Sequence, residues 1–260
     1  MLLVYDGGFI SWAYGSDKKR WVAFHSAAAR IARGWVAIDS FATYRSQLMP
    51  SYKAHRAIKD KHPDIRMLVR QFVNDELKPN VPTLQLDGFE ADDIIAALHY
   101  FRNCRAVVGE DKDLLQLPGL TLTRLDLMGS RTIYDFVSKM PIKLQPYIRR
   151  PRDVLFALCI FGDTSDNIPR ILPKRDYDTF NHLLKEPHPF TAASEEWGPQ
   201  VGINLWLTVL PSPFSFAELA TPDDLLCLVD NAEWWLDTSR LPYAALQTQV
   251  LERVDERIHV

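Results

Sequence analysis

Acidic side chains recur at short intervals along this chain, and the groups follow apolar runs. Carboxylates that converge repel one another and are costly to bury, so a cluster of them needs cations. Oxygen donors without Cys or His favour Mg²⁺ or Mn²⁺ over zinc. The nine candidate metal ligands are Asp6, Asp39, Glu90, Asp92, Asp93, Asp111, Asp113, Asp163 and Asp166.

Two divalent cations about 3.5–4 Å apart can activate water and stabilise the leaving oxygen of a phosphodiester. Each acidic segment by itself has a simpler explanation. Asp6 could end a strand in a turn, Glu90–Asp93 could be the acidic first turn of a helix, and Asp111–Asp113 could be a solvated turn. The whole set, in this order, is harder to explain by chance.

Alternating short strands and helices predict the scaffold that positions these acids. Strands are expected at Leu2–Tyr5, Trp35–Ile38, Val81–Leu86, Arg105–Val108 and Leu120–Leu125, because these runs are bounded by Gly, Pro and Asp and several are rich in branched residues. Helices are expected from Ser16 to Arg33, after Pro63 and from Glu90. The pattern predicts an α/β fold with a mostly parallel central sheet flanked by helices. Sites in such sheets form at the carboxyl ends of the strands.

After Pro141 the strand signals fade and short helical segments follow. Helices are expected at Arg152–Phe161, Tyr177–Leu184, Glu195–Leu210 and Pro222–Val229, whereas Lys185–Pro199 is expected to be a mobile loop. We therefore predict an α/β core at residues 1–140, with a basic segment at about 43–80, and a helical subdomain at residues 141–260.

Composition sets outer limits on function. The formal charge of −3 argues at first against nucleic acid, because proteins that bind it are usually basic. The three cysteines imply neither a disulfide framework nor a zinc site. The first residues do not form a signal peptide, and the apolar run Val154–Phe161 is far shorter than the roughly 20 residues that span a membrane. A cytoplasmic protein without a membrane partner is expected.

Several stretches resemble the 5′ nuclease family, which includes the 5′→3′ exonuclease domain of bacterial DNA polymerase I, the bacteriophage 5′ exonucleases and the flap endonucleases. The matching stretches are LLVYDGG, AIDSFATYRSQLMPSYKAHR, LDGFEADDIIAAL, VVGEDKDLLQL and LCIFGDTSDNIP, which together extend over residues 2–169. The resemblance implies a PIN-like fold with a helical DNA-binding subdomain. It also implies that the nine acids hold two Mg²⁺ or Mn²⁺ ions.

The resemblance assigns roles to basic and aromatic residues as well. Lys53 and Arg56 match positions that contact the scissile phosphate, where they would offset charge in the transition state. Tyr52 matches a position that stacks on a terminal base. Residues 43–70 carry seven Lys and Arg against two acids, as expected for the family's helical arch, although a solvated helix face is the alternative. Further DNA contacts are expected from Arg45, Lys59 and Lys61.

The chain departs from the family pattern at three places, one of which is Glu110, where many relatives have a glycine before the aspartate. No arginine follows Asp6 in the segment Gly7–Tyr14, so one phosphate contact is missing or supplied elsewhere. The glycine-rich hairpin expected after Pro169 is replaced by a segment without glycine, which makes a K⁺ site doubtful. Arg170, Lys174 and Arg175 could contact duplex phosphates there instead, in a sequence-independent and salt-sensitive way.

The sequence therefore predicts a structure-dependent 5′→3′ exonuclease or flap endonuclease that hydrolyses DNA by a two-metal mechanism. The expected partner is DNA with a 5′ end, flap or nick, and the protein is expected to be a monomer from a bacterial cell or a phage. The alternatives are a related nuclease acting on RNA–DNA hybrids or RNA, and a non-catalytic DNA-junction protein. Without the nine acids, the rest of the chain carries a formal charge of +6.

Overall fold

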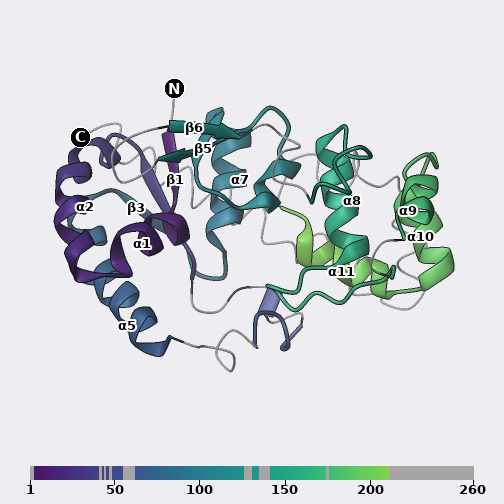
Figure 1. Cartoon of the computed structure of the whole chain (residues 1–260), viewed down its shortest axis with the longest axis horizontal. Helices are drawn as coiled ribbons and strands as arrows, with labels where there is room; N and C mark the ends of the chain where they lie inside the picture. The colour runs from purple at the N-terminus through teal and green to yellow at the C-terminus, as the bar shows by residue number, and fades with distance from the viewer. Residues whose placement is uncertain are drawn as a thin grey trace.

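A six-stranded sheet is the centre of the fold (Figure 1). The computed structural model describes residues 3–40, 43, 45–46, 49–54, 62–125, 131–134, 141–173 and 176–210. The strands are β1 (Leu3–Asp6), β2 (Trp35–Ile38), β3 (Thr83–Gln85), β4 (Ala106–Val108), β5 (Thr121–Leu125) and β6 (Arg131–Tyr134). Their order is β3-β2-β1-β4-β5-β6, with every pair parallel except β5 and β6. The predicted α/β fold class is confirmed.

Helices cover both faces of the sheet and continue beyond it. Their bounds are α1 (Gly7–Gly15), α2 (Lys18–Ile31), α5 (Pro63–Phe72), α6 (Lys78–Asn80), α7 (Ala91–Arg102), α8 (Pro151–Phe161), α9 (Tyr177–Leu183), α10 (Pro189–Trp197) and α11 (Gln200–Thr208). A π-helical segment, η1 (Val73–Leu77), and a 3₁₀ helix, η2 (Lys112–Gln116), complete the described elements. In Figure 1, α1, α2 and α5 lie at the left and α8–α11 at the right. No helix within the described ranges is both long and apolar enough to cross a membrane.

Alternating side chains on the strands divide the core into two layers, because successive residues of a strand point to opposite faces. Val4, Ala37, Leu84, Val107 and Leu122 pack with α7, η2 and α8. Tyr5, Val36 and Val108 pack in a second cluster with α1, α2 and α5. Both faces of the sheet are thus apolar, as expected for parallel strands between helices.

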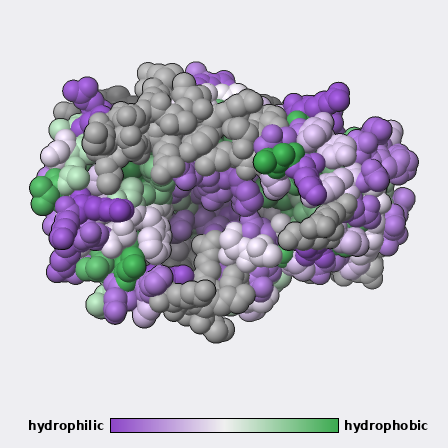
Figure 2. Space-filling view, viewed as in Figure 1, coloured by the Kyte–Doolittle hydropathy of each residue, from purple (hydrophilic) through white to green (hydrophobic). Residues whose placement is uncertain are grey.

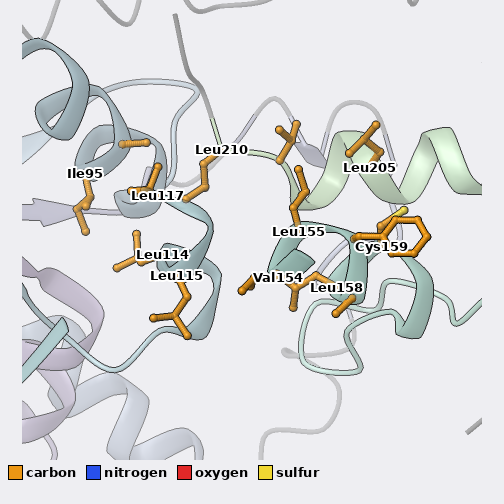
Figure 3. Close-up of a cluster of buried hydrophobic side chains, with 14 of the residues drawn as sticks. Ile95, Leu114, Leu115, Leu117, Val154, Leu155, Leu158, Cys159, Leu205 and Leu210 are labelled. Carbon is orange, nitrogen blue, oxygen red and sulfur yellow. The ribbon is translucent and has the colours of Figure 1, made fainter. Parts of the chain in front are cut away.

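The first apolar layer extends without a break into the helical region. Leu114 and Leu115 of η2 belong to the same buried cluster as Leu155 of α8 and Leu205 of α11 (Figure 3). This packing fixes the segment after β4, which carries two of the candidate acids, against α8. The predicted division at residue 140 stays a prediction, and this shared core joins the two sides of it.

The structure corrects four of the element predictions. Helix α1 was not expected, since Gly7 and Gly8 are poor helix formers, but Asp6 caps it. Strand β6 was also missed. The expected loop at 185–199 contains α10, which begins at Pro189 and buries Phe190. The helix predicted at Glu195–Leu210 is two helices, because Gly198 adopts a positive φ of 70° between α10 and α11. The helix predicted at 222–229 lies outside the described residues.

The core between η2 and α8 provides a test of the fold. Leu155 is 1% exposed, so Leu155→Ala is expected to lower the free energy of unfolding by about 2–5 kcal/mol, from lost burial and the cavity that remains. Urea denaturation measures this change. Ile142→Ala is the matched control, because Ile142 is 83% exposed and should change stability by less than about 0.5 kcal/mol. Equal effects of the two substitutions would contradict the described packing.

Candidate active site

Five carboxylates meet at the carboxyl edge of the parallel strands. They are Asp6 at the end of β1, Asp39 after β2, Asp92 in the first turn of α7 after β3, and Asp111 and Asp113 after β4. Strand β1 pairs with β2 on one side and β4 on the other, so the ends of these strands are neighbours. The sheet order therefore brings acids together that are more than 100 residues apart in the sequence.

Backbone N–H groups hold three of these carboxylates. Asp6 Oδ1 accepts from Gly8 N at 2.8 Å and caps α1, and Asp39 Oδ1 accepts from Ala91 N at 2.8 Å. Asp111 Oδ1 accepts from Asp113 N at 2.9 Å. Each carboxylate is thus fixed at the start of a helical segment, where N–H groups favour negative charge.

Close approach of backbone segments at Asp6 requires glycine. A Cβ atom on Gly7 would lie 2.3 Å from the carbonyl oxygen of Ala37, and one on Gly109 would lie 2.9 Å from Cβ of Asp6. Both distances are shorter than real Cβ contacts allow. The two glycines therefore let the ends of β1, β2 and β4 come together around the acids.

Mutual repulsion and burial disfavour the charged forms of these acids. Burial and then the charges of Asp111 and Asp39 raise the pKa of Asp6 to about 7. Burial and then Asp111 raise the pKa of Asp92 well above its ordinary value. The same causes raise the pKa of Asp113 to about 7, although Lys112 opposes them. The acids therefore interact with one another, and Lys112, whose Nζ lies 3.3 Å from Asp113 Oδ1, only partly offsets the rise of the pKa of Asp113.

The remaining four predicted ligands also contact basic side chains, as Asp113 does through Lys112. Arg45 contacts Glu90 and Asp93, with Nη2 donating to Asp93 Oδ1 at 2.7 Å. Lys112 forms a hydrogen bond and ion pair with Asp163. Although burial acts in the opposite direction, Lys112 lowers the pKa of Asp163.

Lys53 and Tyr52 connect two of these acids. Lys53 Nζ lies 2.7 Å from Glu90 Oε1 and 3.7 Å from Asp166 Oδ2. The Tyr52 hydroxyl lies 3.0 Å from Glu90 Oε2 and 3.2 Å from Asp166 Oδ2. Burial disfavours the charge on Lys53, but Glu90 and Asp166 outweigh it and raise the pKa of Lys53. The predicted catalytic lysine is thus beside the acids, and it remains charged at neutral pH.

The donor set fits a hard divalent cation in its chemistry. It consists of carboxylate oxygens whose repulsion a cation would relieve, and Oδ1 of Asp113 is buried with an ion pair to Lys112 at 3.3 Å but without a hydrogen bond. In the part of the chain that the structure describes, no three His, Cys, Asp or Glu side chains form a group that could hold a metal ion as placed. The predicted assignment of metal ligands therefore stays a proposal.

The predicted DNA-binding residues differ in their exposure to solvent. Arg170 is exposed, as a phosphate contact requires, and its Nε donates to the carbonyl of Phe161. Arg45 and Tyr52 are buried, at 1% and 5% exposure, so in this arrangement neither is open to DNA. Arg56, Lys59, Lys61, Lys174 and Arg175 lie outside the described residues. Sequence reasoning missed Lys112, whose place between Asp111 and Asp113 was the available signal.

The molecular surface agrees with a polar site. Hydrophilic residues line a hollow near the middle of the face shown in Figure 2. The site thus combines acids at the ends of neighbouring strands, a lysine beside them, and glycines that allow the backbone segments to approach closely. The fold and the site define the class as an α/β protein with an acidic centre at the edge of a parallel sheet.

Comparison with known proteins agrees with this class. Residues 24–140 match the family model described as the 5′-3′ exonuclease, N-terminal resolvase-like domain. DNA polymerase I of Rhizobium leguminosarum is 32% identical over 155 residues, which are 55% of this chain and 14% of that protein. A 5′-3′ exonuclease of Buchnera aphidicola subsp. Acyrthosiphon pisum is 28% identical over 149 residues, or 55% and 49% of the two chains. The chain thus covers less than half of these curated relatives.

A solved structure resembles nearly the whole chain. The zinc-bound 5′-exonuclease of T5 has a TM-score of 0.62 and 16% identity, covering 96% of this chain and 98% of its own. The fold is therefore that of T5 5′-exonuclease. Residues 24–140 thus resemble the 5′-3′ exonuclease family, in agreement with the resemblance that the sequence motifs indicated.

The raised pKa of Asp6 leads to a test by stability. The unfolded carboxyl titrates near 3.8 and the folded one near 7, so ionisation of Asp6 destabilises the fold as the pH rises between these values. Asp6→Asn keeps a capping oxygen but removes the charge. Its free energy of unfolding, measured with chelator present, should exceed that of the wild type by about 1–4 kcal/mol at pH 8 and by little at pH 4.

The control for this measurement is Asp87→Asn, which changes an exposed acid outside the cluster. Its stability difference from the wild type should show no comparable growth with pH. A difference for Asp6→Asn that is constant from pH 4 to 8 would contradict the repulsion described here.

Proposed function

We propose that this protein is a divalent-metal-dependent 5′ nuclease that hydrolyses DNA phosphodiesters near 5′ ends or at flap junctions. The observation that carries the proposal is the convergence of Asp6, Asp39, Asp92, Asp111 and Asp113 beside the charged Lys53. The Buchnera aphidicola relative is named a 5′-3′ exonuclease, and a T5 structure with a TM-score of 0.63 is described as a flap endonuclease in complex with DNA and metal ions. Both names support the proposal of a 5′ nuclease.

The proposed cofactor is Mg²⁺ or Mn²⁺, with two ions per site, and no monovalent K⁺ is assigned. When bound, such ions activate water and stabilise charge on the leaving oxygen of a phosphodiester. The strand-end acids Asp6, Asp39, Asp92, Asp111 and Asp113 would hold them, with Asp163 and Asp166 nearby on the turn after α8. Divalent cations would also offset the repulsion that raises the pKa of Asp6 and Asp92.

The chain's own residues position and neutralise the substrate in this proposal. Lys53 contributes a positive charge next to the acids, which would attract a phosphate and offset charge that develops on it. Glu90 and Asp166 hold the ammonium group of Lys53 at the edge of the site. Arg56 has the same proposed role by sequence. Arg170 would contact phosphates of the duplex outside the cleavage site.

The finer aspects of the prediction belong to this proposal as well. We propose that a monomer acts on DNA with a 5′ end, flap or nick, in the cytoplasm of a bacterial cell. The proposed basic arch at 43–80 and helical DNA-binding subdomain at 141–260 would hold the two sides of such a substrate. Binding to phosphates by these surfaces is expected to weaken as salt rises.

Substitution of a central acid tests the chemistry. Asp92→Asn and Asp113→Asn should each lower kcat on a 5′-flap DNA by at least about a hundredfold, since a metal-dependent site loses one ligand. Thermal unfolding should remain cooperative, because neither change creates a cavity. The rate is measured by single-turnover cleavage with Mg²⁺ or Mn²⁺. The control Asp87→Asn should cleave like the wild type. Full activity of both site variants, together with cleavage that EDTA does not inhibit, would refute the proposal.

A substrate panel tests the type of nucleic acid. Blunt duplex, nicked duplex, 5′ flap, circular single-stranded DNA and an RNA–DNA hybrid, each labelled at one strand, should show fastest cleavage at 5′ ends or flaps of DNA. Faster cleavage of the hybrid's RNA strand would favour the RNA-directed alternative. Cleavage of the closed circle would exclude a strict requirement for a 5′ end. Tight binding of all substrates without cleavage at any Mg²⁺ or Mn²⁺ concentration would identify a non-catalytic junction protein.

A further inference from the structure

Arg45 connects three distant segments through one buried guanidinium. Its Nη1 and Nη2 donate to the two carboxylate oxygens of Asp93 at 2.8 and 2.7 Å, and Nη1 lies 3.2 Å from Glu90. Its Nε and Nη2 donate to the carbonyls of Leu207 and Val209 at 3.1 and 3.0 Å. The guanidinium therefore joins the segment before Lys53 to α7 and to the end of α11.

Gln116 of η2 binds the same end of α11 as Arg45 does. Its Nε2 donates to the carbonyl of Thr208 at 2.9 Å, and its Oε1 accepts from Leu210 N at 2.9 Å. Gln116 belongs to η2, the helix that carries Asp113. Four successive residues, Leu207–Leu210, are thus bound alternately by Arg45 and Gln116.

Asn204 links the middle of α11 to the segment with the remaining acids. This residue is fully buried, and its Nδ2 lies 2.7 Å from the carbonyls of both Cys159 and Pro169. Those carbonyls flank the turn that carries Asp163 and Asp166. Helix α11 is therefore bonded directly to the segments that present Asp113 and Asp163, and through Arg45 to the segment that presents Glu90.

We propose that Arg45 and Gln116 are positioning residues, which fasten Leu207–Leu210 to the acid-bearing segments and thereby set the relative places of α7, η2 and the turn after α8. In this assignment Asp93 is the buried counter-ion of Arg45 and not a metal ligand. The inference rests on the proposed nuclease function for its catalytic consequence, but not for the structural coupling itself.

Burial and hydrogen bonding support this assignment over direct DNA contact. A guanidinium that is 1% exposed and bound to a carboxylate through two parallel hydrogen bonds cannot reach a phosphate without breaking that pair. Asp93 Oδ2 also accepts from Glu90 N at 3.0 Å, so both oxygens of Asp93 are engaged. Gln116 carries no charge, so a lower cleavage rate in a Gln116 variant would not result from a lost electrostatic attraction to DNA.

Hydrogen exchange separates coupling from catalysis. Gln116→Leu and Arg45→Met should each speed hydrogen exchange of the backbone amides of Leu207–Leu210 at least about tenfold. The reason is that each substitution removes side-chain hydrogen bonds that hold this segment. If Arg45→Met fails to fold, Arg45→Lys and Gln116→Leu retain the test. Arg170→Gln is the control and should leave this exchange unchanged. Wild-type exchange in Gln116→Leu would overturn the proposal, and this readout needs no nuclease activity.

Salt dependence and metal binding complete the experiment. In EDTA, the slope of log binding constant against log salt concentration for a 5′-flap DNA should be unchanged in Arg45→Met. The same slope should be smaller in magnitude by about one in Arg170→Gln.

With Mg²⁺ present, kcat should fall for Arg45→Lys and Gln116→Leu while KM stays within about twofold. Calorimetric Mg²⁺ affinity should fall at least about tenfold in Asp92→Asn, which removes a ligand, and by a clearly smaller factor in Asp93→Asn, which disturbs only the position of α7. A reduced salt slope in Arg45→Met, or equal metal losses in both Asp variants, would overturn the assignment.

Discussion

Repulsion among carboxylates at one edge of the sheet is the constraint on which the rest of this structure depends. Asp6, Asp92 and Asp113 are buried near other acids, and their raised pKa values show that the fold disfavours their charges. Residues that merely stabilised a fold would not be arranged in this way. Function and stability are therefore opposed at this edge, as is common where a site is built to bind a cation.

The fold tolerates this repulsion by dividing its acids into two sets. Asp6 and Asp92 are surrounded by other acids, whereas Glu90, Asp93, Asp163 and Asp166 contact Arg45, Lys53 or Lys112. Asp113 lies between the two sets, because it interacts both with Asp111 and with Lys112. Paired acids cost less to bury, because each has an opposite charge within hydrogen-bond distance. The division gives the site a mainly acidic centre and a border in which acids are paired with basic side chains.

The residues of this border also connect distant segments of the chain. The segment that carries Arg45 and Lys53 meets α7, η2, the turn after α8 and α11 there through hydrogen bonds. Leu114, Leu155 and Leu205 also join η2, α8 and α11 through apolar packing. The acidic centre is thus held by a rigid frame, although its own charges repel. Such a frame is a requirement for placing a phosphate accurately in any metal-assisted hydrolysis.

The sequence by itself determined the class of the protein and the positions of its acids. The alternation of apolar runs and helical stretches predicted the five parallel strands, and Asp6, Asp39 and Asp111 were expected at strand ends because chemistry in such sheets occurs there. It did not reveal helix α1, whose glycines mask it, or α10. Only the tertiary structure decided which acids are paired and that Arg45 and Tyr52 are buried. Arg45 meets Asp93 and Leu207 across 48 and 162 residues of chain, and no local pattern encodes contacts between segments so far apart.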